Sequence, residues 1–309
     1  MFSYEDPTYL PAAARVVVIG DIHGDLSRLT QTLVGMRIIN NNWEWTAEPK
    51  ETVVVQMGDQ VDSAARVPDL EASSWEQVTD LDVIIFMDRL DTVARCHGGR
   101  AISLVGNHEL MNVMGDYGYV SEHSMKRTGG EDARRLAFRP TGIIGQILAK
   151  RNLVLRVGPL LFVHGGILPI HLDVVQDNLH KMNEAYRRFI REESLSPEDQ
   201  WILAGVLLDS DGVVWTREYM TQEGVAKVPE VLQRTGCIAV FTGHNTVNNI
   251  TSELEGRIWF TDAMLSRAYG REGQTQVLNM MLKPTGEYLI QTISLVDSAS
   301  AAPAGAVAI

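Results

Sequence analysis

Five short apolar stretches of the sequence end beside a glycine and an acid, an amide or a histidine. These endings read Gly20-Asp21-Ile22-His23, Gly58-Asp59-Gln60-Val61-Asp62, Gly106-Asn107-His108, His164-Gly165 and Gly243-His244-Asn245. Carboxylate, imidazole and amide groups are ligands for divalent first-row metal ions. Gathered at one place, such a set can bind two ions that clamp a phosphoryl group and activate a bridging water.

Six of these residues form the candidate metal-binding set. Asp21 and His23 lie two positions apart, so both side chains point to the same side of an extended strand end. Asp59 can share its carboxylate between two ions. The second ion can be completed by Asn107, His164 and His244.

His108 directly follows one candidate ligand and can protonate a leaving oxygen instead of binding metal. Asp62 can orient the His108 ring and raise its pKa, as a carboxylate does for a catalytic imidazole. Four of the eight histidines of the chain lie at these strand ends. We therefore favour one joint site over five unrelated turns that each contain a satisfied polar residue.

The elements that must position these residues alternate along the chain, which indicates an α/β fold. The apolar stretches have the length and composition of buried strands, at residues 16–19, 52–57, 101–105, 160–163 and 238–242. Helical patterns occupy residues 25–36, 75–96 and 172–193, and further strands are expected at 256–261, 276–282 and 287–293. Ligands gather outside the carboxyl ends of strands in open sheets, so the polar endings mark a site.

We expect three parts in the 309-residue chain: an N-terminal extension at 1–14, one domain at 15–295, and a flexible tail at 296–309. The tail is predicted because its residues are mostly small and low in complexity.

Composition excludes several classes of protein. A formal net charge of −12 disfavours nucleic acid as the main partner. No apolar run is long enough for a membrane span, and no basic segment precedes an apolar stretch at the N-terminus. Cys96 and Cys237 lie in apolar contexts and make no CxxC motif, so we expect free core thiols. These features together predict a cytoplasmic protein.

The ordered motifs GDIHG, GDQVD, GNHE, HGG and GHN resemble the metallophosphoesterase (calcineurin-like) superfamily, and within it the phosphoprotein phosphatase family. The stretches GNHELMNVMGDYGYV, RPTGIIGQILAKRNLVLRVGPLLFVHGGILPIHL, VVWTREY and TDAMLSRAYG are similar to its Shewanella-like (bacterial-like) branch. The resemblance runs from about residue 15 to about residue 290 and so covers nearly the whole predicted domain.

This resemblance implies a central β-sandwich of mixed sheets flanked by helices, with a dinuclear metal site at the C-terminal ends of the strands. It implies one metal on Asp21, His23 and Asp59, and the other on Asp59, Asn107, His164 and His244. His108 would be the general acid, paired with Asp62, and a metal-bridging hydroxide would be the nucleophile. The implied reaction is hydrolysis of phosphate monoesters on Ser, Thr or Tyr. We expect manganese, with iron or zinc as alternatives.

One departure concerns the phosphate-binding residues. The family usually continues its second motif as Asp-Arg-Gly, whereas this chain has Ser63 at the position of that arginine. An arginine binds phosphate with two parallel hydrogen bonds and a serine cannot. Arg217 in VVWTREY matches another arginine of the family expected to contact phosphate. The candidate substrate-binding residues are therefore Arg217, Arg66 and Asn107, with Arg267 and Arg139 as further possibilities.

Two other functions stay open. The chain can be a small-molecule phosphoesterase, such as a dinucleoside polyphosphate hydrolase, which shares GDIHG and the second motif. It can also be a weakened phosphatase that binds phosphoproteins without turnover, which the loss of the arginine after Asp62 favours. The expected partner is a phosphoprotein or a small phosphorylated substrate, without nucleic acid or membrane. Oligomeric state is left open.

Overall fold

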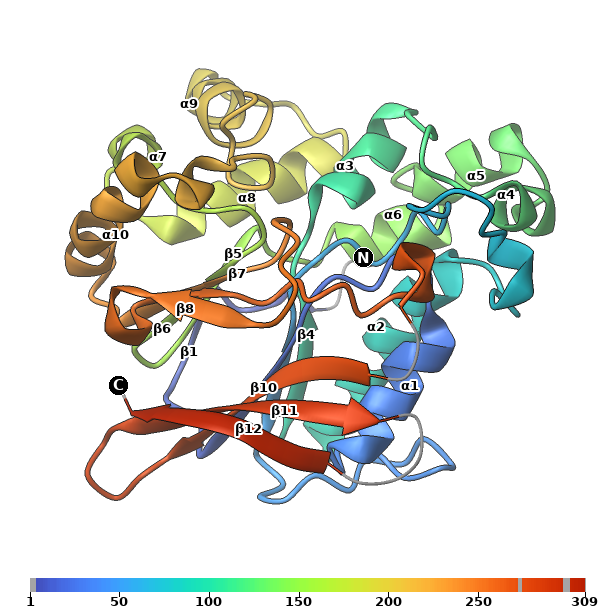
Figure 1. Cartoon of the computed structure of the whole chain (residues 1–309). Coiled ribbons are helices and arrows are strands. Elements are labelled where there is room, and N and C mark those ends of the chain that lie inside the picture. Colours follow the sequence, from blue (N-terminus) through green and yellow to red (C-terminus); the bar gives the residue numbers. More distant parts are fainter. Residues whose placement is uncertain (1–3, 272–273, 297–300, 309) are drawn as a thin grey trace.

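The computed structural model describes residues 4–271, 274–296 and 301–308 of the chain. Two six-stranded mixed sheets pack face to face, and helices cover their outer faces (Figure 1). This arrangement confirms the α/β sandwich implied by the motifs. No helix of the described residues is long and apolar enough to cross a bilayer.

The first sheet has the strand order β1-β5-β6-β7-β9-β8, and the second has the order β12-β11-β10-β2-β3-β4. The strands of the first sheet are β1 (Tyr9–Leu10), β5 (Val154–Val157), β6 (Leu160–Val163), β7 (Ala239–Thr242), β8 (Thr251–Glu253) and β9 (Ile258–Phe260). Those of the second sheet are β2 (Arg15–Ile19), β3 (Val53–Gln56), β4 (Arg100–Ser103), β10 (Gln274–Leu282), β11 (Tyr288–Val296) and β12 (Ala301–Ala308).

Ten α-helices lie within the described residues. They are α1 (Leu26–Gly35), α2 (Leu81–Cys96), α3 (Asn107–Met114), α4 (Glu122–Thr128), α5 (Glu131–Phe138), α6 (Ile143–Leu148), α7 (Pro169–Val175), α8 (Leu179–Ile190), α9 (Pro197–Ile202) and α10 (Gln222–Thr235). Short helical turns occupy Ala72–Ser74, Leu203–Leu207, Glu218–Met220, Leu254–Gly256 and Arg267–Tyr269.

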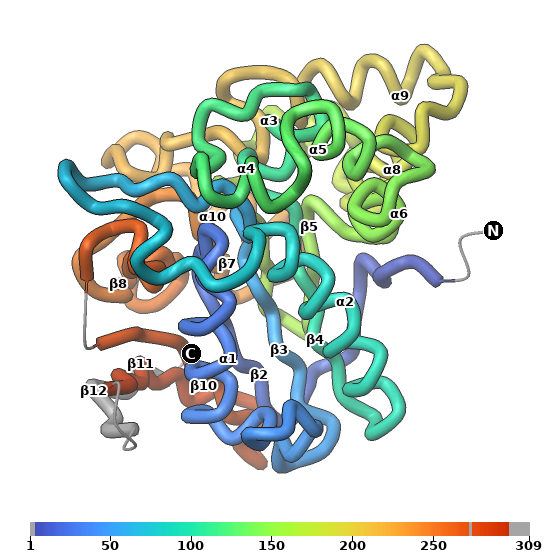
Figure 2. The backbone as a smooth tube through the Cα atoms, turned by 90° about the vertical axis from the view of Figure 1, so that its right-hand side faces the viewer, coloured from blue at the N-terminus to red at the C-terminus, as the bar shows by residue number. Residues whose placement is uncertain are grey.

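Alternation of side chains along the strands explains the layers. In β2, Val16 and Val18 face the first sheet and join Phe162 and Phe241 in the core between the sheets. Val17, one position away, joins an outer core with side chains of α1 and α2. Figure 2 shows these two helices in front of β2, β3 and β4. A third core lies between the outer face of the first sheet and helices α6 to α10.

Strand register brings the predicted site residues to one edge. β2, β3 and β4 are parallel, and Ile19 pairs with Gln56, which pairs with Ser103. The loops that follow these three strands therefore leave the sheet at the same level. β6 and β7 of the other sheet are also parallel to each other, and their carboxyl ends reach the same site.

The structure differs from the sequence predictions in several elements. The helix expected at residues 172–193 is two helices, because Gln176 takes a left-handed conformation with φ of 55° and ends α7. The helix expected from residue 75 begins at Leu81, after a short helical turn. Cys237 is buried as expected, but Cys96, at the end of α2, is exposed; neither forms a disulfide.

Both predicted terminal segments contain a strand. Tyr9 and Leu10, within the predicted extension, pair with β5 in parallel. Residues 301–308, within the predicted tail, pair with β11 as the antiparallel edge strand β12. The expected domain limits at residues 15 and 295 stay a prediction.

Candidate metal centre

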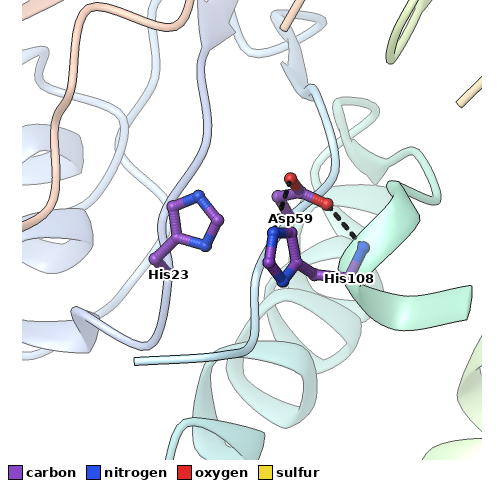
Figure 3. A group of neighbouring side chains, drawn as sticks. All are labelled: His23, Asp59 and His108. Carbon is purple, nitrogen blue, oxygen red and sulfur yellow. Dashed lines mark hydrogen bonds and ion pairs between the residues drawn. The ribbon is translucent and has the colours of Figure 1, made fainter. Parts of the chain in front are cut away.

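The six candidate metal ligands converge at the edge where the two sheets meet. Asp59 is central, because its carboxylate belongs to two clusters of side chains. Ligand atoms of His23, Asp59 and His108 lie within 4.8 Å of one another, and so do those of Asp59, His164 and His244. Figure 3 shows the first cluster, whose members come from the loops after β2 and β3 and from the start of α3.

The remaining two candidates contact these clusters directly. Asn107 Oδ1 lies 3.1 Å from His164 Nε2, and the same histidine nitrogen lies 3.2 Å from Asp59 Oδ2. Asp21 Oδ2 accepts a hydrogen bond of 3.0 Å from the backbone N–H of His244. All six side chains are buried.

Each candidate histidine is fixed through one ring nitrogen, which leaves the other ring nitrogen for the centre. His164 Nδ1 lies 2.7 Å from the Met57 carbonyl, and His244 Nε2 lies 2.9 Å from the Trp215 carbonyl. His23 Nδ1 lies 3.2 Å from the carbonyl of Val61. The nitrogen of His164 or His244 that faces a carbonyl carries a proton, so the opposite nitrogen is the one that can bind an ion. This is the usual orientation of metal-binding histidines. At His23, Nδ1 lies near both a carbonyl and the Arg66 guanidinium.

Asp21 shows that the donor set fits a cation. Its Oδ1 is buried without a hydrogen-bond partner, and so is Oδ2 of the neighbouring Asp262. Burial and the nearby carboxylates of Asp262 and Asp59 raise the pKa of Asp21 well above its usual value. Burial raises the pKa of Asp262 to about 7. A bound divalent ion would reverse this electrostatic penalty, since it is the largest local charge in such a site.

The opposite shift occurs at Asp59. Although burial alone would raise the pKa of this carboxyl, His164 and His108 outweigh burial and hold the pKa well below its usual value. At His244, no neighbouring carboxylate outweighs the effect of burial on the pKa. Burial, together with nearby His164, lowers the pKa of His244 to about 3, so this ring is neutral and can act as a ligand.

His108 and Asp62 form a buried pair beside the candidate ligands. His108 Nδ1 lies 2.6 Å from Asp62 Oδ2, while its backbone N–H donates to Asp59 Oδ1 at 2.9 Å. Burial opposes the charged imidazole, but the carboxylates of Asp59 and Asp62 outweigh it and raise the pKa of His108. A histidine held in this way can donate a proton from Nε2.

Backbone conformation at the site is unusual. His23, Asp59, Asp62 and His244 all have positive φ, between 41° and 68°. A non-glycine residue in this region costs on the order of 1–3 kcal/mol and persists only where its surroundings hold it.

Close approach of two loops explains a glycine at the site. A Cβ on Gly106 would lie 2.2 Å from Asp59 Oδ1 and 2.5 Å from the Asp59 nitrogen. Only a residue without a side chain therefore lets the loop after β4 approach the loop after β3.

Glu109 fixes the two loops together, and sequence reasoning assigned it no role. Its Oε2 accepts from the N–H groups of Asp59 at 2.9 Å and Gly106 at 2.7 Å. Its Oε1 accepts from the N–H of Gln60 at 2.6 Å. The signal in the sequence was the acid directly after Asn107-His108, at the first turn of a helix, where a carboxylate is stabilised by free N–H groups.

Ser63 turns away from the centre, into a separate buried network. Its hydroxyl donates to Glu76 Oε1 at 2.7 Å and lies 3.0 Å from the hydroxyl of Ser121. Arg66, three residues later, reaches back instead. Its Nη2 donates to the Asp62 carbonyl at 3.1 Å and lies 3.3 Å from His23 Nδ1. Its guanidinium covers the Tyr119 ring, and that ring packs edge-on against His108.

Arg217 lies at the opposite side of the site. Its Nη1 donates to Asn245 Oδ1 at 3.1 Å and to the His244 carbonyl at 3.4 Å. The acid that follows Arg217 in the chain, Glu218, pairs with Lys227 instead.

The other two arginines considered from the sequence are placed differently. Arg267 binds both oxygens of the buried Asp25 carboxylate, with Nη2 at 2.6 Å from Oδ1 and Nε at 2.9 Å from Oδ2. Arg139 is exposed at the end of α5. Arg66 and Arg217 are thus the two candidates that lie against candidate site residues.

A groove of about 550 Å³ lies beside the Arg66 loop. Ala64, Ala65 and Val120 line it, and Glu71 and Glu122 are among its polar residues. The backbone N–H of Ala64 donates to the Tyr119 carbonyl, which joins the groove wall to the segment that packs against His108.

Comparison with known proteins agrees with the motifs. Residues 14–247 match the family model described as calcineurin-like phosphoesterase. Shewanella-like protein phosphatase 2 of Arabidopsis thaliana is 28% identical over 219 residues, which cover 57% of this chain and 51% of that protein. Shewanella-like protein phosphatase 1 of Plasmodium berghei is 25% identical over 74% of this chain and 60% of that protein. The chain thus matches 51% to 60% of the length of these two relatives.

Solved structures agree with the fold. The cold-active protein-tyrosine phosphatase of a psychrophilic Shewanella species superposes with a TM-score of 0.77, covering 98% of this chain and 84% of that one. Its sequence identity is 22%, so the likeness shows the fold alone. The resemblance to the Shewanella-like branch is confirmed by these relatives, while the roles of the individual site residues stay predictions.

Glu109→Gln tests whether the carboxylate holds the two site loops together. A glutamine keeps one acceptor oxygen but must turn its NH₂ toward at least one of the three backbone N–H donors, which would then lose its acceptor. We expect the free energy of unfolding to fall by about 3 kcal/mol, measured by urea denaturation in EDTA. Glu122→Gln is the control, because that side chain is 93% exposed. Equal stability of the two variants would contradict the role assigned to Glu109.

Proposed function

Because the chain belongs to the calcineurin-like phosphoesterase family, we propose that it hydrolyses phosphate monoesters with the help of two divalent metal ions. The observation that carries this proposal is the position of Asp59, whose buried carboxylate belongs to both clusters of ligand atoms. A carboxylate so placed can bridge two ions, which is the arrangement that in-line phosphoryl displacement uses.

In this proposal Asp21, His23 and Asp59 hold one ion, and Asp59 is shared with the second. The second ion is completed by Asn107, His164 and His244. When bound, the ions supply an activated water and neutralise charge on the phosphate oxygens. The unpartnered Asp21 oxygen and the inward-facing histidine nitrogens support this assignment. Imidazole, carboxylate and amide ligands suit manganese, with iron or zinc as alternatives.

His108 is proposed as the general acid that protonates the leaving oxygen of the ester. Asp62 accepts from its Nδ1 and so fixes the ring with Nε2 toward the centre. The distance of 3.8 Å from His108 Nε2 to Asp59 Oδ2 supports this orientation. Because Asp59 would bind the ions, the hydrogen bond to Asp62 is the contact that would favour the protonated His108 ring in the metal-bound protein, as an acid catalyst requires.

We propose that Arg66 and Arg217 bind the phosphate from two sides. Arg66 comes from the loop beside His23, and Arg217 lies against His244. Arg66 would then supply, three residues later in the chain, the charge that Ser63 lacks. Asn107, which can place its amide between ion and substrate, is the third substrate-binding residue of the proposal.

A phosphoprotein is the proposed substrate. Two relatives are named protein phosphatases, and the groove beside the Arg66 loop offers room for residues that flank a phosphorylated side chain. Lys126 also lines this groove and pairs with Glu122, so the charge of the groove does not decide between the substrates, whereas the net charge of −12 disfavours a highly anionic dinucleoside polyphosphate. The small-molecule phosphoesterase therefore ranks second. A binder without turnover ranks third, since the buried His108–Asp62 pair has no role in binding alone.

Metal removal and restoration tests the central proposal. Metal-stripped protein should not hydrolyse p-nitrophenyl phosphate, and Mn²⁺ should restore turnover because the nucleophile depends on the ions. Phosphotyrosine and phosphothreonine peptides and a dinucleoside polyphosphate, assayed in parallel, identify the substrate class. His164→Ala should bind fewer than two ions per chain by elemental analysis. Full turnover in EDTA, or two bound ions without turnover of any substrate, would overturn the proposal.

His108→Ala tests the general acid. Phenyl phosphate has a poor leaving group and needs a proton in the transition state, whereas p-nitrophenyl phosphate needs it much less. We expect kcat/KM to fall by about 10²–10⁴ for phenyl phosphate and by far less for p-nitrophenyl phosphate. The role is wrong if the two substrates lose activity equally while two ions stay bound.

Arg66→Ala tests the replacement for the missing arginine. We expect KM for p-nitrophenyl phosphate to rise by about tenfold or more, since a charged hydrogen bond to phosphate contributes about 1.5–3 kcal/mol. Arg66→Lys should recover only part of this loss, because lysine cannot bind two oxygens in parallel. Arg139→Ala, an exposed arginine at the end of α5, is the matched control. An unchanged KM in Arg66→Ala would exclude Arg66 from the phosphate site.

A further inference from the structure

A closed network of buried polar groups lies behind the His108–Asp62 pair. Arg134, in α5, binds both oxygens of Asp80 at 2.8 Å, and its Nε donates to Asn112 Oδ1 at 2.7 Å. Asn112 Nδ2 in turn donates to Asp62 Oδ1 at 2.7 Å. The backbone N–H of Asp62 donates to Asp80 Oδ2 at 2.9 Å. The network thus begins and ends at Asp62.

The charges of this network depend on one arginine. Asp62 and Asp80 are both fully buried, and each carboxylate needs a compensating charge. The Arg134 guanidinium lies between them, with Nη2 at 3.6 Å from Asp62 Oδ1. Burial alone would raise the pKa of Asp80, but Arg134 outweighs it and lowers that pKa below its usual value. Removing Arg134 would leave two buried carboxylates facing each other, with His108 beside Asp62 as the remaining basic group of the pair.

The backbone and carboxylate of Asp62 are both held in place by the network. The φ of Asp62 is 68°, in the left-handed region, where an aspartate stays only when its surroundings hold it. Asp80 fixes its backbone N–H, and Asn112 fixes the carboxylate oxygen that does not face His108. Asn112 Nδ2 also donates to the His108 carbonyl at 2.9 Å, so one amide connects both members of the pair.

Arg134 itself cannot touch a substrate. Its side chain is 0% exposed, whereas the side chain of the next residue, Arg135, is 50% exposed and pairs with Glu131. Any influence of Arg134 on the reaction must therefore pass through its partners Asp80 and Asn112, which bind Asp62 and, in the case of Asn112, also His108. This separates it from Arg66 and Arg217, which lie beside the candidate ligands.

We infer that Arg134 is a positioning residue, which through Asp80 and Asn112 holds Asp62 in the one orientation that fixes the His108 ring. The inference rests on the proposed role of His108 as proton donor. The motif residues alone would then not align the general acid. Helix α5 must also be packed in place, with Arg134 buried against Asp80 and Asn112. Loss of Arg134 should therefore weaken protonation of the leaving group while the metal ligands remain in place.

Arg134→Met tests this inference by two readouts. The ratio of kcat/KM for p-nitrophenyl phosphate to that for phenyl phosphate should rise by about tenfold, in the same direction as in His108→Ala. In the proton NMR spectrum of Mn²⁺-free Arg134→Met, the downfield signal of the His108 Nδ1–H should be absent. This signal is assigned in the unaltered protein as the one that His108→Ala lacks. Two metal ions should still bind. Arg134→Lys, which keeps the charge but not the paired hydrogen bonds, should fall between Arg134→Met and the unaltered protein.

Two variants control for lost stability and altered charge. Arg135→Met removes the neighbouring exposed arginine, and Arg100→Met removes a buried one that binds Asp91 and Asp6 at the start of β4. Both should keep the substrate ratio and the His108 signal. Asn112→Ala, which breaks the same network with a smaller change, carries the test if Arg134→Met does not fold.

The two proposals fail in different ways. An unchanged substrate ratio in His108→Ala would reject the general acid, but loss of the His108 signal in Arg134→Met would still support positioning. An unchanged signal and ratio in a folded Arg134→Met or Asn112→Ala would overturn the inference about Arg134.

Discussion

The mutual repulsion of buried charges at Asp59 is the constraint on which the rest of the site depends. Asp21, Asp59 and Asp262 lie close enough to shift one another's pKa, in a place where water cannot screen them. Histidines offset part of this charge at Asp59, but Asp21 keeps a buried oxygen without a partner. A site built in this way is most stable when cations occupy it. The fold must therefore hold the ligands firmly enough that they do not move apart without metal.

Backbone groups provide that rigidity. The carbonyls of Met57, Val61 and Trp215 fix three histidine rings, and Glu109 collects the N–H groups of two loops. These hydrogen bonds use main-chain atoms, which the parallel register of the strands places at one level. The same hydrogen bonds hold the site residues that have positive φ, because each of their loops is fixed on more than one side. The sheets thus fix the positions of the site loops, and these loops carry the side chains that can bind ions and substrate.

The sequence predicted the strands, and it predicted that the candidate ligands gather at one edge, because these residues follow apolar runs, which is a local pattern. Their role as metal ligands stays a prediction. The sequence could not predict Arg134, since nothing in Glu131–Phe138 distinguishes a buried arginine from Arg135 beside it. That difference arises from tertiary packing, because α5 docks against α3 and thereby places Arg134 on Asp80, which lies 54 residues earlier in the chain. The break between α7 and α8 was missed for a similar reason. Leu172–Glu193 keeps an amphipathic pattern through Gln176, where only the tertiary fold reveals the left-handed turn.

The replacement of an arginine by Ser63 illustrates how local packing and chemistry are linked. An arginine at this position would have to enter the space where Ser63 binds Glu76 and Ser121, or else turn toward His23. With serine there, the loop is anchored inward by the hydroxyl, and it becomes partly exposed from Ala64 to Arg66, where the Arg66 backbone N–H donates to the Ala268 carbonyl. The guanidinium then comes back over Tyr119 to the carbonyl of Asp62. Positive charge near the centre is therefore retained, but on a side chain three residues later in the chain. This position places the charge beside the groove as well as beside His23, so phosphate binding and recognition of the flanking residues would depend on the same segment.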